Sequence, residues 1–307
     1  MAIKNDVKKA LKNVVAQKIL YDEPMVRHTS LAVGGNADAL VFIENEDQLE
    51  QVVRRLVEKN IQFFPAGNLT NVIVRDSGYR GAILLMTGMK EISCEHTQEN
   101  YGYISAQSGV SLARAVNLSV AEELTGLEFC SGIPGSVGGA LWMNAGAYGR
   151  EMKDVIESVT ILDREGVKKI LKKEDIVFGY RKASFPDHSI IMAARIKLEK
   201  GERWRIKEKI NEILQSRQDK HPLDYPSAGS IFKNLPGQPA GRIIEDMGLK
   251  GITAGGAQIS FKHANFIINR GHATAADILT LIELVQFRAR EEKGVNLETE
   301  VVIIGED

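Results

Sequence analysis

Three residues of this chain could do acid–base or charge-stabilising chemistry. Glu300 lies inside the apolar run LETEVVII, where alternation could place its carboxylate on either the buried or the solvent face. If the side chain points inward, its pKa should be raised unless a cation such as Arg181 pairs with it. Arg181 follows Tyr180 in FGYRKASFPDH, a loop rich in aromatic and basic residues. Ser230 lies in AGSIFKN, between Gly229 and Ile231.

Each of these residues also has an ordinary structural explanation. Arg181 could be a surface cation, Ser230 a turn serine, and Lys220, which precedes His-Pro, a solvated lysine. Their spacing alone matches no known catalytic arrangement. They remain candidates that need support from elsewhere in the chain.

Common metal and nucleotide motifs are missing from the sequence. The six histidines are scattered, without HExxH or paired carboxylates at metal-ligand spacing, so no metal site is expected. Cys94 and His96 lie in a polar segment between two expected strands, and we expect them to be incidental. The chain has no GxSxG, no GxxxxGK[ST] and no GxGxxG.

Two glycine-rich segments favour a bound dinucleotide instead. Residues 126–149 contain seven glycines in 24 positions, and Glu128 is their single ionisable acid or base. Such a composition disfavours helix and strand but lets backbone N–H groups approach a phosphate closely. The loop Gly67–Asn71 follows an expected parallel strand, where α/β proteins bind ligands, and its Thr and Asn side chains add donors.

The totals describe an ordinary globular chain of 307 residues, with a formal net charge of -1. Nucleic-acid binding by bulk charge is therefore not expected. The longest apolar runs are far shorter than the ~20 residues of a membrane helix, and the N-terminus lacks an apolar signal core. Two cysteines without ligand spacing suit a reducing compartment, so we expect a cytoplasmic protein without membrane insertion. The oligomeric state cannot be read from the sequence.

Periodicity and turn signals predict an α/β chain whose domain boundary lies near Gly201. The expected helices are 5–20, 47–59, 112–123 with Ser111 as cap, 200–220, 240–247 and about 274–293. The expected strands are 39–43, 61–64, 82–86, 101–107, 155–162, 167–171, 190–198, two around Lys262, and 297–304.

Seven motifs, taken in order, resemble those of the UDP-N-acetylenolpyruvoylglucosamine reductases. They span about residues 27–305 and are PAGNLTNVIVRD, GLEFCSGIPGSVGGALWMNAGAYG, GYRKASF, AGSIFKN, GLKG, GGAQISFKHANFIIN and LETEVVIIG. The short span between the GYR loop and Gly201 is similar to the family's compact, type II-like subtype, which lacks an extra substrate-covering loop.

The resemblance implies a vanillyl-alcohol-oxidase (PCMH-type) FAD-binding fold, of class α/β (α+β). After an N-terminal helix (1–26) it implies an FAD-binding domain over 27–200, with subdomains of about 27–81 and 82–200, and a smaller α/β substrate domain over 201–307. FAD would be held non-covalently. The implied FAD contacts are Gly67, Asn68, Leu69, Thr70, Asn71, Gly132, Ile133, Pro134, Gly135, Ser136, Gly138, Gly139, Asn144, Ala145 and Gly146.

The resemblance also implies the reaction of a UDP-N-acetylmuramate dehydrogenase in peptidoglycan precursor synthesis, and hence a role in cell wall, cell shape and division. NADPH would reduce FAD, hydride would pass to C3 of the enolpyruvyl ether of UDP-N-acetylglucosamine, and a proton would be added at C2. By position, Arg181 and Glu300 match the pair that polarises the substrate carboxylate, and Ser230 matches the proton donor. Tyr180, Lys220 and Asn234 match substrate-binding positions, with Lys220 suited to the UDP diphosphate.

Four positions differ from the family pattern. These are Leu69 in the first phosphate loop, Ala183 after the GYR motif, Leu235 before Pro236, and Cys130, which we expect to be a small core residue. Two other functions are kept as alternatives. One is an FAD-dependent oxidase of a hydroxy acid or alcohol on the same fold, and the other is a non-catalytic nucleotide-binding module. The motifs AGSIFKN and LETE favour the reductase, and the intact Arg181, Ser230 and Glu300 argue against the module.

Overall fold

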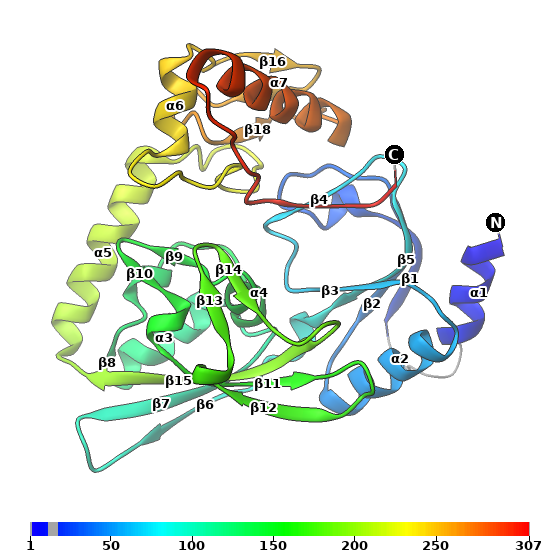
Figure 1. The fold of residues 1–307 in the computed structure, drawn as a ribbon. Coiled ribbons are helices and arrows are strands. Elements are labelled where there is room, and N and C mark those ends of the chain that lie inside the picture. Colours follow the sequence, from blue (N-terminus) through cyan, green and yellow to red (C-terminus); the bar gives the residue numbers. More distant parts are fainter. Residues whose placement is uncertain (1, 12–17, 307) are drawn as a thin grey trace. The chain divides into compact units, whose positions relative to one another are not determined.

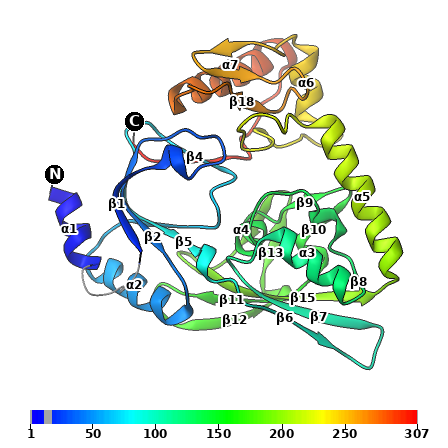
Figure 2. The ribbon, with the colours of Figure 1, turned by 180° about the vertical axis from the view of Figure 1, so that it is seen from behind.

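The computed structural model describes residues 2–11 and 18–306 as a mixed α/β chain that divides into two compact units. Unit 1 consists of the residues up to Leu20, Leu40–Asn68 and Ala82–Arg217. Unit 2 consists of Tyr21–Ala39, Leu69–Gly81 and the residues from Gln218 onward. Figure 1 shows the chain coloured along its sequence, and Figure 2 shows it from behind.

Unit 1 contains a six-stranded sheet of order β12-β11-β15-β7-β6, in which β8 also pairs with β15. Its pairs are antiparallel, and helices α3 and α4 lie on the same face of the sheet (Figures 1 and 2). The sheet strands are β6 (Ile92–His96), β7 (Tyr101–Gln107), β8 (Leu124–Thr125), β11 (Ile156–Leu162), β12 (Lys168–Lys172) and β15 (Ile190–Lys200). The helices are α1 (Ala2–Leu11), α2 (Glu46–Glu58), α3 (Leu112–Ala121) and α4 (Val137–Trp142).

The core of unit 1 is built from the inward faces of these strands and helices. Alternate residues of β7 and β15, such as Ile104, Ala106, Ala194 and Ile196, are buried against α3 and α4. The shorter strands are β3 (Phe63–Ala66), β9 (Gly146–Ala147), β10 (Arg150–Glu151), β13 (Val177–Gly179) and β14 (Lys182–Ser184).

Unit 2 has a separate core around helix α7 (Ala275–Lys293). Thr274 caps this helix in a capping box with Asp277, and Gly294 ends it in the left-handed conformation. Its other elements are α6 (Ala240–Asp246), the three-stranded sheet β16 (Thr253–Ala254), β17 (Ala257–Ile259) and β18 (Ile267–Asn269), and the parallel pair β4 (Val72–Val74) and β19 (Val302–Ile304).

Four elements contain residues of both units. They are β1 (Ile19–Pro24), β2 (Asn36–Phe42), β5 (Tyr79–Leu85) and α5 (Arg203–Lys220). The first three form a sheet with β3 in the order β1-β2-β5-β3, in which β3 and β5 run parallel. Among the residues described, none of the helices is both long enough and apolar enough to cross a membrane.

Most expected elements are confirmed near their predicted bounds. The helix 112–123 is α3, and Ser111 caps it by accepting a hydrogen bond from the Arg114 amide at 3.2 Å. The hairpin turn at 163–166 joins β11 to β12, with the Asp163 carboxylate accepting from the Val167 amide at 2.8 Å.

Four expectations are wrong in part. The helix expected over 5–20 includes α1, but Ile19 and Leu20 belong to strand β1, and 12–17 lie outside the described residues. Val137–Trp142 forms helix α4 inside the glycine-rich stretch, because Ser136 caps it and its glycines permit close packing. The polar segment around Cys94 is strand β6, and the strand expected over 297–304 is regular at 302–304 alone within the described chain.

Candidate functional site

The two glycine-rich segments meet within unit 1. A Cβ placed on Gly67 would lie 2.3 Å from Ser136 Oγ, and one placed on Gly138 would lie 2.6 Å from Ser108 Cβ. No side chain fits at either position without displacement of its neighbour. The glycines therefore let the loop after β3 pack closely against the start of α4, and their expected approach to a phosphate stays a prediction.

The amides that remain open to a ligand in this crevice are fewer than the glycine pattern suggested. The amides of Val137, Gly138 and Gly139 donate to protein oxygens at 2.8, 2.9 and 3.3 Å. Ser136 lies opposite Ser111 in an antiparallel bridge, and the residues next to each of them make the two hydrogen bonds of this bridge. The Ser136 amide therefore points away from Ser111. Within the described part of the chain, the amides without a protein acceptor here are those of Gly132, Gly135 and Ser136.

Two buried hydroxyl groups near the crevice also have no partner. Ser108 Oγ and Ser131 Oγ are buried and form no hydrogen bond with any described residue. Unpaired buried hydroxyls are costly, and a ligand rich in acceptor oxygens would satisfy them. Small side chains, open amides and unpaired hydroxyls together fit the diphosphate of a dinucleotide.

The end of the glycine-rich stretch is tied to the hairpin that contains Arg181. Asn144 is fully buried in the left-handed conformation, and its side-chain amide donates to the Gly179 carbonyl at 3.0 Å and to Glu151 Oε2 at 3.0 Å. Arg181, at the two-residue turn between β13 and β14, donates from Nη2 to the Gly146 carbonyl at 2.8 Å. These contacts fix the half-buried guanidinium on the run Asn144–Gly146.

Sequence reasoning missed one cation of unit 1. Arg217, on α5, lies so close to Gly132 that a Cβ on that glycine would be 2.9 Å from Arg217 Nε. Burial lowers the pKa of Arg217, partly offset by Tyr148. The basic helix around it hides this residue among many solvated charges, so no sequence signal distinguishes it.

The expected residues Leu69, Thr70 and Asn71 belong to unit 2. Leu69 is buried in the left-handed conformation, and the Thr70 carbonyl accepts from Ser30 Oγ at 3.1 Å. The Asn71 side-chain amide donates to the Glu300 carbonyl at 3.0 Å. This loop is therefore joined to the segment of the expected catalytic acid.

Ser230 lies on a strand-like segment held on both sides by backbone hydrogen bonds. The Ile231 amide donates to the Asn265 carbonyl at 2.8 Å, and the Glu300 amide donates to the Ile231 carbonyl at 2.7 Å. Asn265 is buried, and its side chain forms two hydrogen bonds with the Phe232 backbone. Its Oδ1 accepts from the Phe232 amide at 3.0 Å, and its Nδ2 donates to the Phe232 carbonyl at 2.8 Å. Ser230 and Glu300 are thereby fixed on neighbouring backbone segments, and Glu300 is half-buried.

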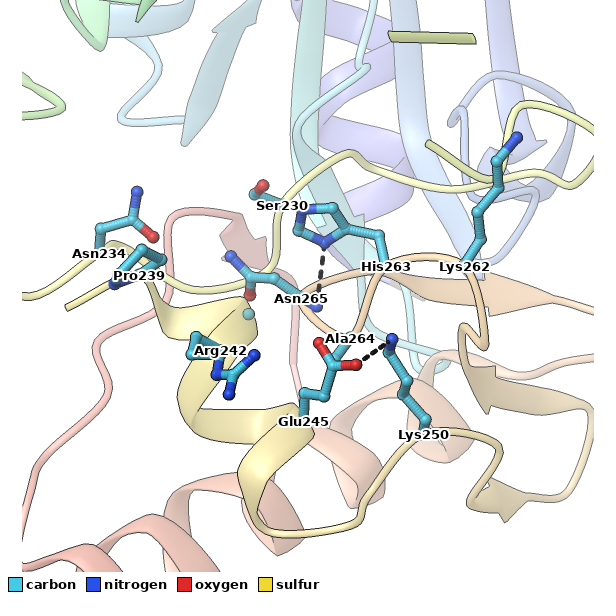
Figure 3. Close-up of a pocket in the computed structure, with 11 residues that line it drawn as sticks. Ser230, Asn234, Pro239, Arg242, Glu245, Lys250, Lys262, His263, Ala264 and Asn265 are labelled. Atoms are coloured by element: carbon cyan, nitrogen blue, oxygen red, sulfur yellow. Dashed lines mark hydrogen bonds and ion pairs between the residues drawn. The ribbon is translucent and has the colours of Figure 1, made fainter. Parts of the chain in front are cut away.

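Ser230 lines a hollow of about 260 Å³ within unit 2. Figure 3 shows its hydroxyl beside the His263 ring and Asn265, with Arg242 and Glu245 of α6 on the other side. Within the described chain, Ser230 Oγ makes no hydrogen bond to another protein group. The full lining is Ser230, Asn234, Pro239, Gly241, Arg242, Glu245, Lys250, Lys262, His263, Ala264 and Asn265.

The charge of this hollow suits an anion. Arg242, Lys250 and Lys262 outnumber the acid Glu245, which pairs with Lys250 at 2.6 Å. Burial and the positive charge of Lys250 lower the pKa of His263, whose Nδ1 accepts from the Asn265 amide at 3.2 Å. A neutral imidazole is therefore the form that the hollow favours near neutral pH.

The remaining candidates have less distinctive surroundings. Asn234 lines the hollow, and its Oδ1 accepts from the Ala240 amide at the start of α6, at 2.9 Å. Lys220 is exposed at the last residue of α5 and does not line the hollow. Tyr180 is 45% exposed, with the Arg181 guanidinium 5.0 Å from its ring centre. Cys130 is buried in the core, as expected, and burial raises its pKa to about 12.

The structure distributes the expected catalytic residues over both units. Arg181 belongs to unit 1, and Ser230 and Glu300 belong to unit 2. Sequence reasoning also missed Arg242, Lys250 and His263, although GLKG and FKHANF were among the motifs that carried the resemblance. The motifs marked the segments, but they did not identify the side chains that face the hollow.

Two family models match the chain. Residues 37–170 match the family model of an FAD binding domain, and residues 221–304 match that of the UDP-N-acetylenolpyruvoylglucosamine reductase C-terminal domain. The UDP-N-acetylenolpyruvoylglucosamine reductase of Syntrophus aciditrophicus is 48% identical over 301 residues, which cover 98% of this chain and 96% of the relative. The protein of the same name in Caldanaerobacter subterraneus is 45% identical, over 96% of this chain and 97% of the relative.

A solved structure extends the match to the fold. The crystal structure of UDP-N-acetylenolpyruvylglucosamine reductase from Thermus caldophilus aligns with a TM-score of 0.78 and 32% identity, covering 94% of this chain and 98% of that one. The expected fold class and the expected cofactor FAD are thus confirmed. Because the chain is 45–48% identical to these relatives over nearly its full length and shares their fold, it belongs to the UDP-N-acetylenolpyruvoylglucosamine reductase family.

Proposed function

We propose that the two units divide the work of the family's reductase reaction. The chain is an NADPH-dependent flavoenzyme of peptidoglycan precursor synthesis. In the proposal, unit 1 holds FAD at the crevice between Gly67 and Ser136, and unit 2 binds the UDP-sugar and supplies the proton. The observation that carries it is Ser230, which lines a cationic hollow and whose hydroxyl makes no hydrogen bond to another described residue.

Unit 1 contains hydrogen-bond donors and a positive charge that could bind the diphosphate of the cofactor. The amides of Gly135 and Ser136 and the buried Ser108 and Ser131 hydroxyls supply donors, and Arg217 beside Gly132 supplies positive charge. When bound and reduced by NADPH, FAD supplies the hydride. If Arg217 neutralises the diphosphate, Arg217→Ala weakens FAD binding about tenfold or more, while Arg205→Ala, an exposed arginine on the same helix, does not. Equal FAD affinity in both variants would argue against this assignment.

Arg181 and Glu300 are proposed to stabilise the charge that forms on the substrate's enolpyruvyl carboxylate. A vinyl ether accepts hydride at C3 only when its carboxylate can take up the electron pair. Arg181 Nη2 donates to the Gly146 carbonyl, which fixes the guanidinium, and the planar fork of a guanidinium matches the geometry of a carboxylate. Glu300 would act as a protonated or cation-bridged acid, because two bare carboxylates repel each other.

Ser230 is proposed to protonate C2 of the same group. A serine hydroxyl is a weak acid, so the carbanion at C2 must be nearly formed when the proton moves. The two backbone hydrogen bonds of the adjacent Ile231 fix the chain next to Ser230, which lowers the cost of aligning its hydroxyl at that moment. The cations of the hollow favour the serine alkoxide left behind.

The test separates the two half-reactions under anaerobic conditions. Flavin bleaching by NADPH reports the first, and return of the oxidised flavin on addition of the enolpyruvyl substrate, but not of lactate, reports the second. Ser230→Ala is expected to leave the first half unchanged and slow the second by at least about 10³-fold, in the range of lost acid catalysis. The matched control is Ser227→Ala, on the same loop but outside the hollow.

Loss of both halves to the same degree in Ser230→Ala would refute the assignment. Deuterium from heavy water should appear at C2 of the product, because the serine hydroxyl that protonates C2 exchanges its proton with the solvent. A reaction of the wild-type flavin with lactate would instead favour the alternative function, an FAD-dependent oxidase of a hydroxy acid or alcohol.

We further infer that the chain acts in the cytoplasm. Its two cysteines, Cys94 and Cys130, are both free thiols, which suits a reducing compartment. NADPH and nucleotide sugars are soluble metabolites of that compartment. Fractionation of cells that express a tagged chain tests this, and recovery with the membrane pellet would contradict it.

A further inference from the structure

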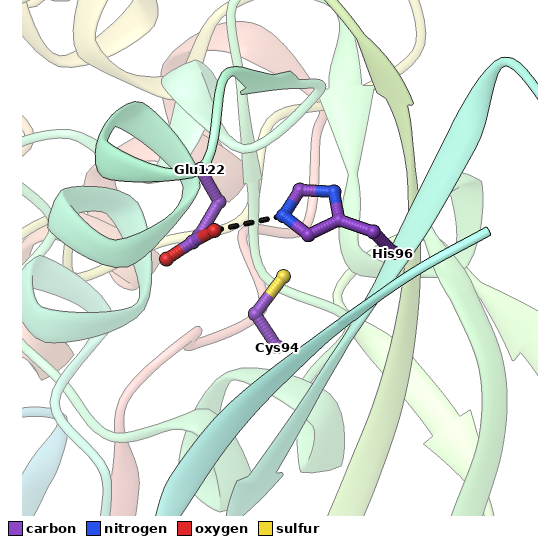
Figure 4. Close-up of side chains that lie close together, drawn as sticks. All are labelled: Cys94, His96 and Glu122. Atoms are coloured by element: carbon purple, nitrogen blue, oxygen red, sulfur yellow. Dashed lines mark hydrogen bonds and ion pairs between the residues drawn. The ribbon is translucent and has the colours of Figure 1, made fainter. Parts of the chain in front are cut away.

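A second group of reactive side chains lies in unit 1, apart from every residue assigned to the reductase site. Cys94 and His96 are two positions apart on β6, so their side chains leave the same face of the sheet. Glu122 follows α3 at its C-terminal end and reaches the same place. Figure 4 shows the three side chains directed toward one another.

The distances within this group are short. His96 Nε2 lies 2.8 Å from Glu122 Oε2, and one ligand atom from each of the three residues lies within 4.8 Å of the other two. Cys94 is half-buried against the core, Glu122 is half-buried and His96 is exposed. The group is therefore open to solvent on one side and backed by packed protein on the other.

The surrounding elements hold these positions for identifiable reasons. His96 lies opposite Gly102 on β7, and a Cβ on that glycine would lie 3.1 Å from Leu124, so Leu124 packs against the strand at this point. Leu118 is one helical turn before Glu122, and Leu118 and Cys94 both pack against the core of unit 1. Glu95 points to the opposite face of the sheet and pairs with Arg195 at 2.8 Å, so it does not compete.

We propose that Cys94, His96 and Glu122 form a binding site for one Zn²⁺ ion. Zinc accepts thiolate, imidazole and carboxylate ligands together, at about 2.3, 2.0–2.1 and 2.0–2.2 Å, in tetrahedral geometry. The ligand atoms need to close by small side-chain rotations, since they already lie within 4.8 Å of one another. Water from the open side completes the fourth position.

The ligand chemistry distinguishes zinc from harder ions. Ca²⁺ and Mg²⁺ prefer oxygen ligands and would find a single carboxylate here, whereas a thiolate and an imidazole suit Zn²⁺ and Co²⁺. Binding displaces the thiol proton and the proton shared by His96 and Glu122. Because the ligands come from β6 and from the end of α3, the ion would link these two elements.

The test uses the full chain with FAD bound, freed of metal by a chelator and dialysed. Titration with Zn²⁺ in a calorimeter is expected to show one equivalent bound. Titration with Co²⁺ is expected to give a thiolate-to-cobalt charge-transfer band and the visible bands of a tetrahedral ion. Cys94→Ser, His96→Gln and Glu122→Gln are each expected to weaken Zn²⁺ binding at least tenfold, and Cys94→Ser abolishes the charge-transfer band.

The matched control is Glu123→Gln, because Glu123 adjoins Glu122 but its carboxylate lies 3.5 Å from Arg203. This variant should bind Zn²⁺ like the wild type, and the melting temperature of both should rise with added Zn²⁺. FAD content, which should be the same in all variants, shows that each has folded. Absence of stoichiometric Zn²⁺ binding by the folded wild type, or unchanged binding by Cys94→Ser and His96→Gln, would overturn the proposal.

Discussion

The side-chain amide of Asn71 donates to the backbone carbonyl of Glu300 across 3.0 Å, although 229 positions separate the two residues. The contact precedes the parallel pairing of Val72–Val74 with Val302–Ile304, which brings the two segments together. The Glu300 amide in turn donates to Ile231, next to Ser230. An expected cofactor loop, the expected acid and the expected proton donor are thus joined by consecutive hydrogen bonds within unit 2.

Asn71→Ala should slow the second half-reaction more than it weakens FAD binding. The substitution removes a hydrogen bond that fixes the Glu300 backbone, with a net value of about 1 kcal/mol, or about fivefold in rate. Stopped-flow reoxidation at saturating substrate measures this, and FAD titration of the apoprotein is the companion measurement. A rate that returns to wild type once excess FAD is supplied would show that Asn71 acts on the cofactor alone.

Gly67→Ala should release FAD. The new Cβ would lie 2.3 Å from Ser136 Oγ and must move the cap of α4 or the loop itself, at a cost of about 1–3 kcal/mol. FAD retained after gel filtration measures the effect. The control is Gly179→Ala, where the nearest atom is 4.0 Å away.

A double-mutant cycle identifies the cause of that loss. Ser136→Ala alone removes a helix cap worth about 1 kcal/mol, yet it also removes the atom that the new Cβ meets. Ser136→Ala should therefore be less harmful in the Gly67→Ala background than in the wild type. Simple additivity would show that the two loops do not press against each other.

Asn144→Asp should destabilise unit 1 strongly. The buried side-chain amide donates to the Gly179 carbonyl and to the Glu151 carboxylate, and an aspartate would place negative charge against both. We expect a loss of about 3 kcal/mol, seen as a lower urea midpoint. Asn45→Asp is the control, because Asp caps α2 as well as Asn does, and its midpoint should stay at the wild-type value.

The pKa of His263 predicts a loss of stability in mild acid. Burial and Lys250 lower this pKa below its ordinary value of 6.5, so the unfolded chain takes up the proton first as the pH falls. The stabilisation is complete above pH 6.5 and is lost as the pH falls through the folded-state pKa. Melting temperatures between about pH 7.5 and 5 should fall less steeply in His263→Asn, which keeps an acceptor for the Asn265 amide. His188→Asn, at an exposed histidine, should follow the wild-type profile, and identical slopes in all three proteins would exclude His263 as the cause.

Local patterns predicted the elements whose stability is local. Helices α2, α3 and α7 have apolar periodicity and capping residues, and all three lie close to their expected bounds. Strand β6 was missed because its exposed face is polar and its inner face has a single aliphatic side chain, Ile92, followed by Cys94 and His96. Helix α4 was missed because its glycines, unfavourable in isolation, are needed to pack against Ser108 and Ser136.

The site was predictable where a residue lies inside a motif, and not where a contact crosses the fold. Arg181, Ser230 and Glu300 were proposed from the motifs around them, and their roles stay predictions. Arg217 reaches Gly132 from a helix that is basic along much of its length. His263 lies in the turn that joins β17 to β18, and the folding of this hairpin brings it to the same hollow as Ser230. Those relationships depend on tertiary packing, which residue spacing does not encode.

Because β19 pairs with β4, the sequences of the two units are completed at different times during translation. All segments of unit 1 have been made once Arg217 has been added, whereas unit 2 waits for Val302–Ile304 to pair with Val72–Val74. Chains fold from the N-terminus as they emerge, so unit 1 has its whole sequence before unit 2 does. A nascent chain halted between the two points would carry Arg181 but neither a finished Glu300 segment nor a paired β4 strand.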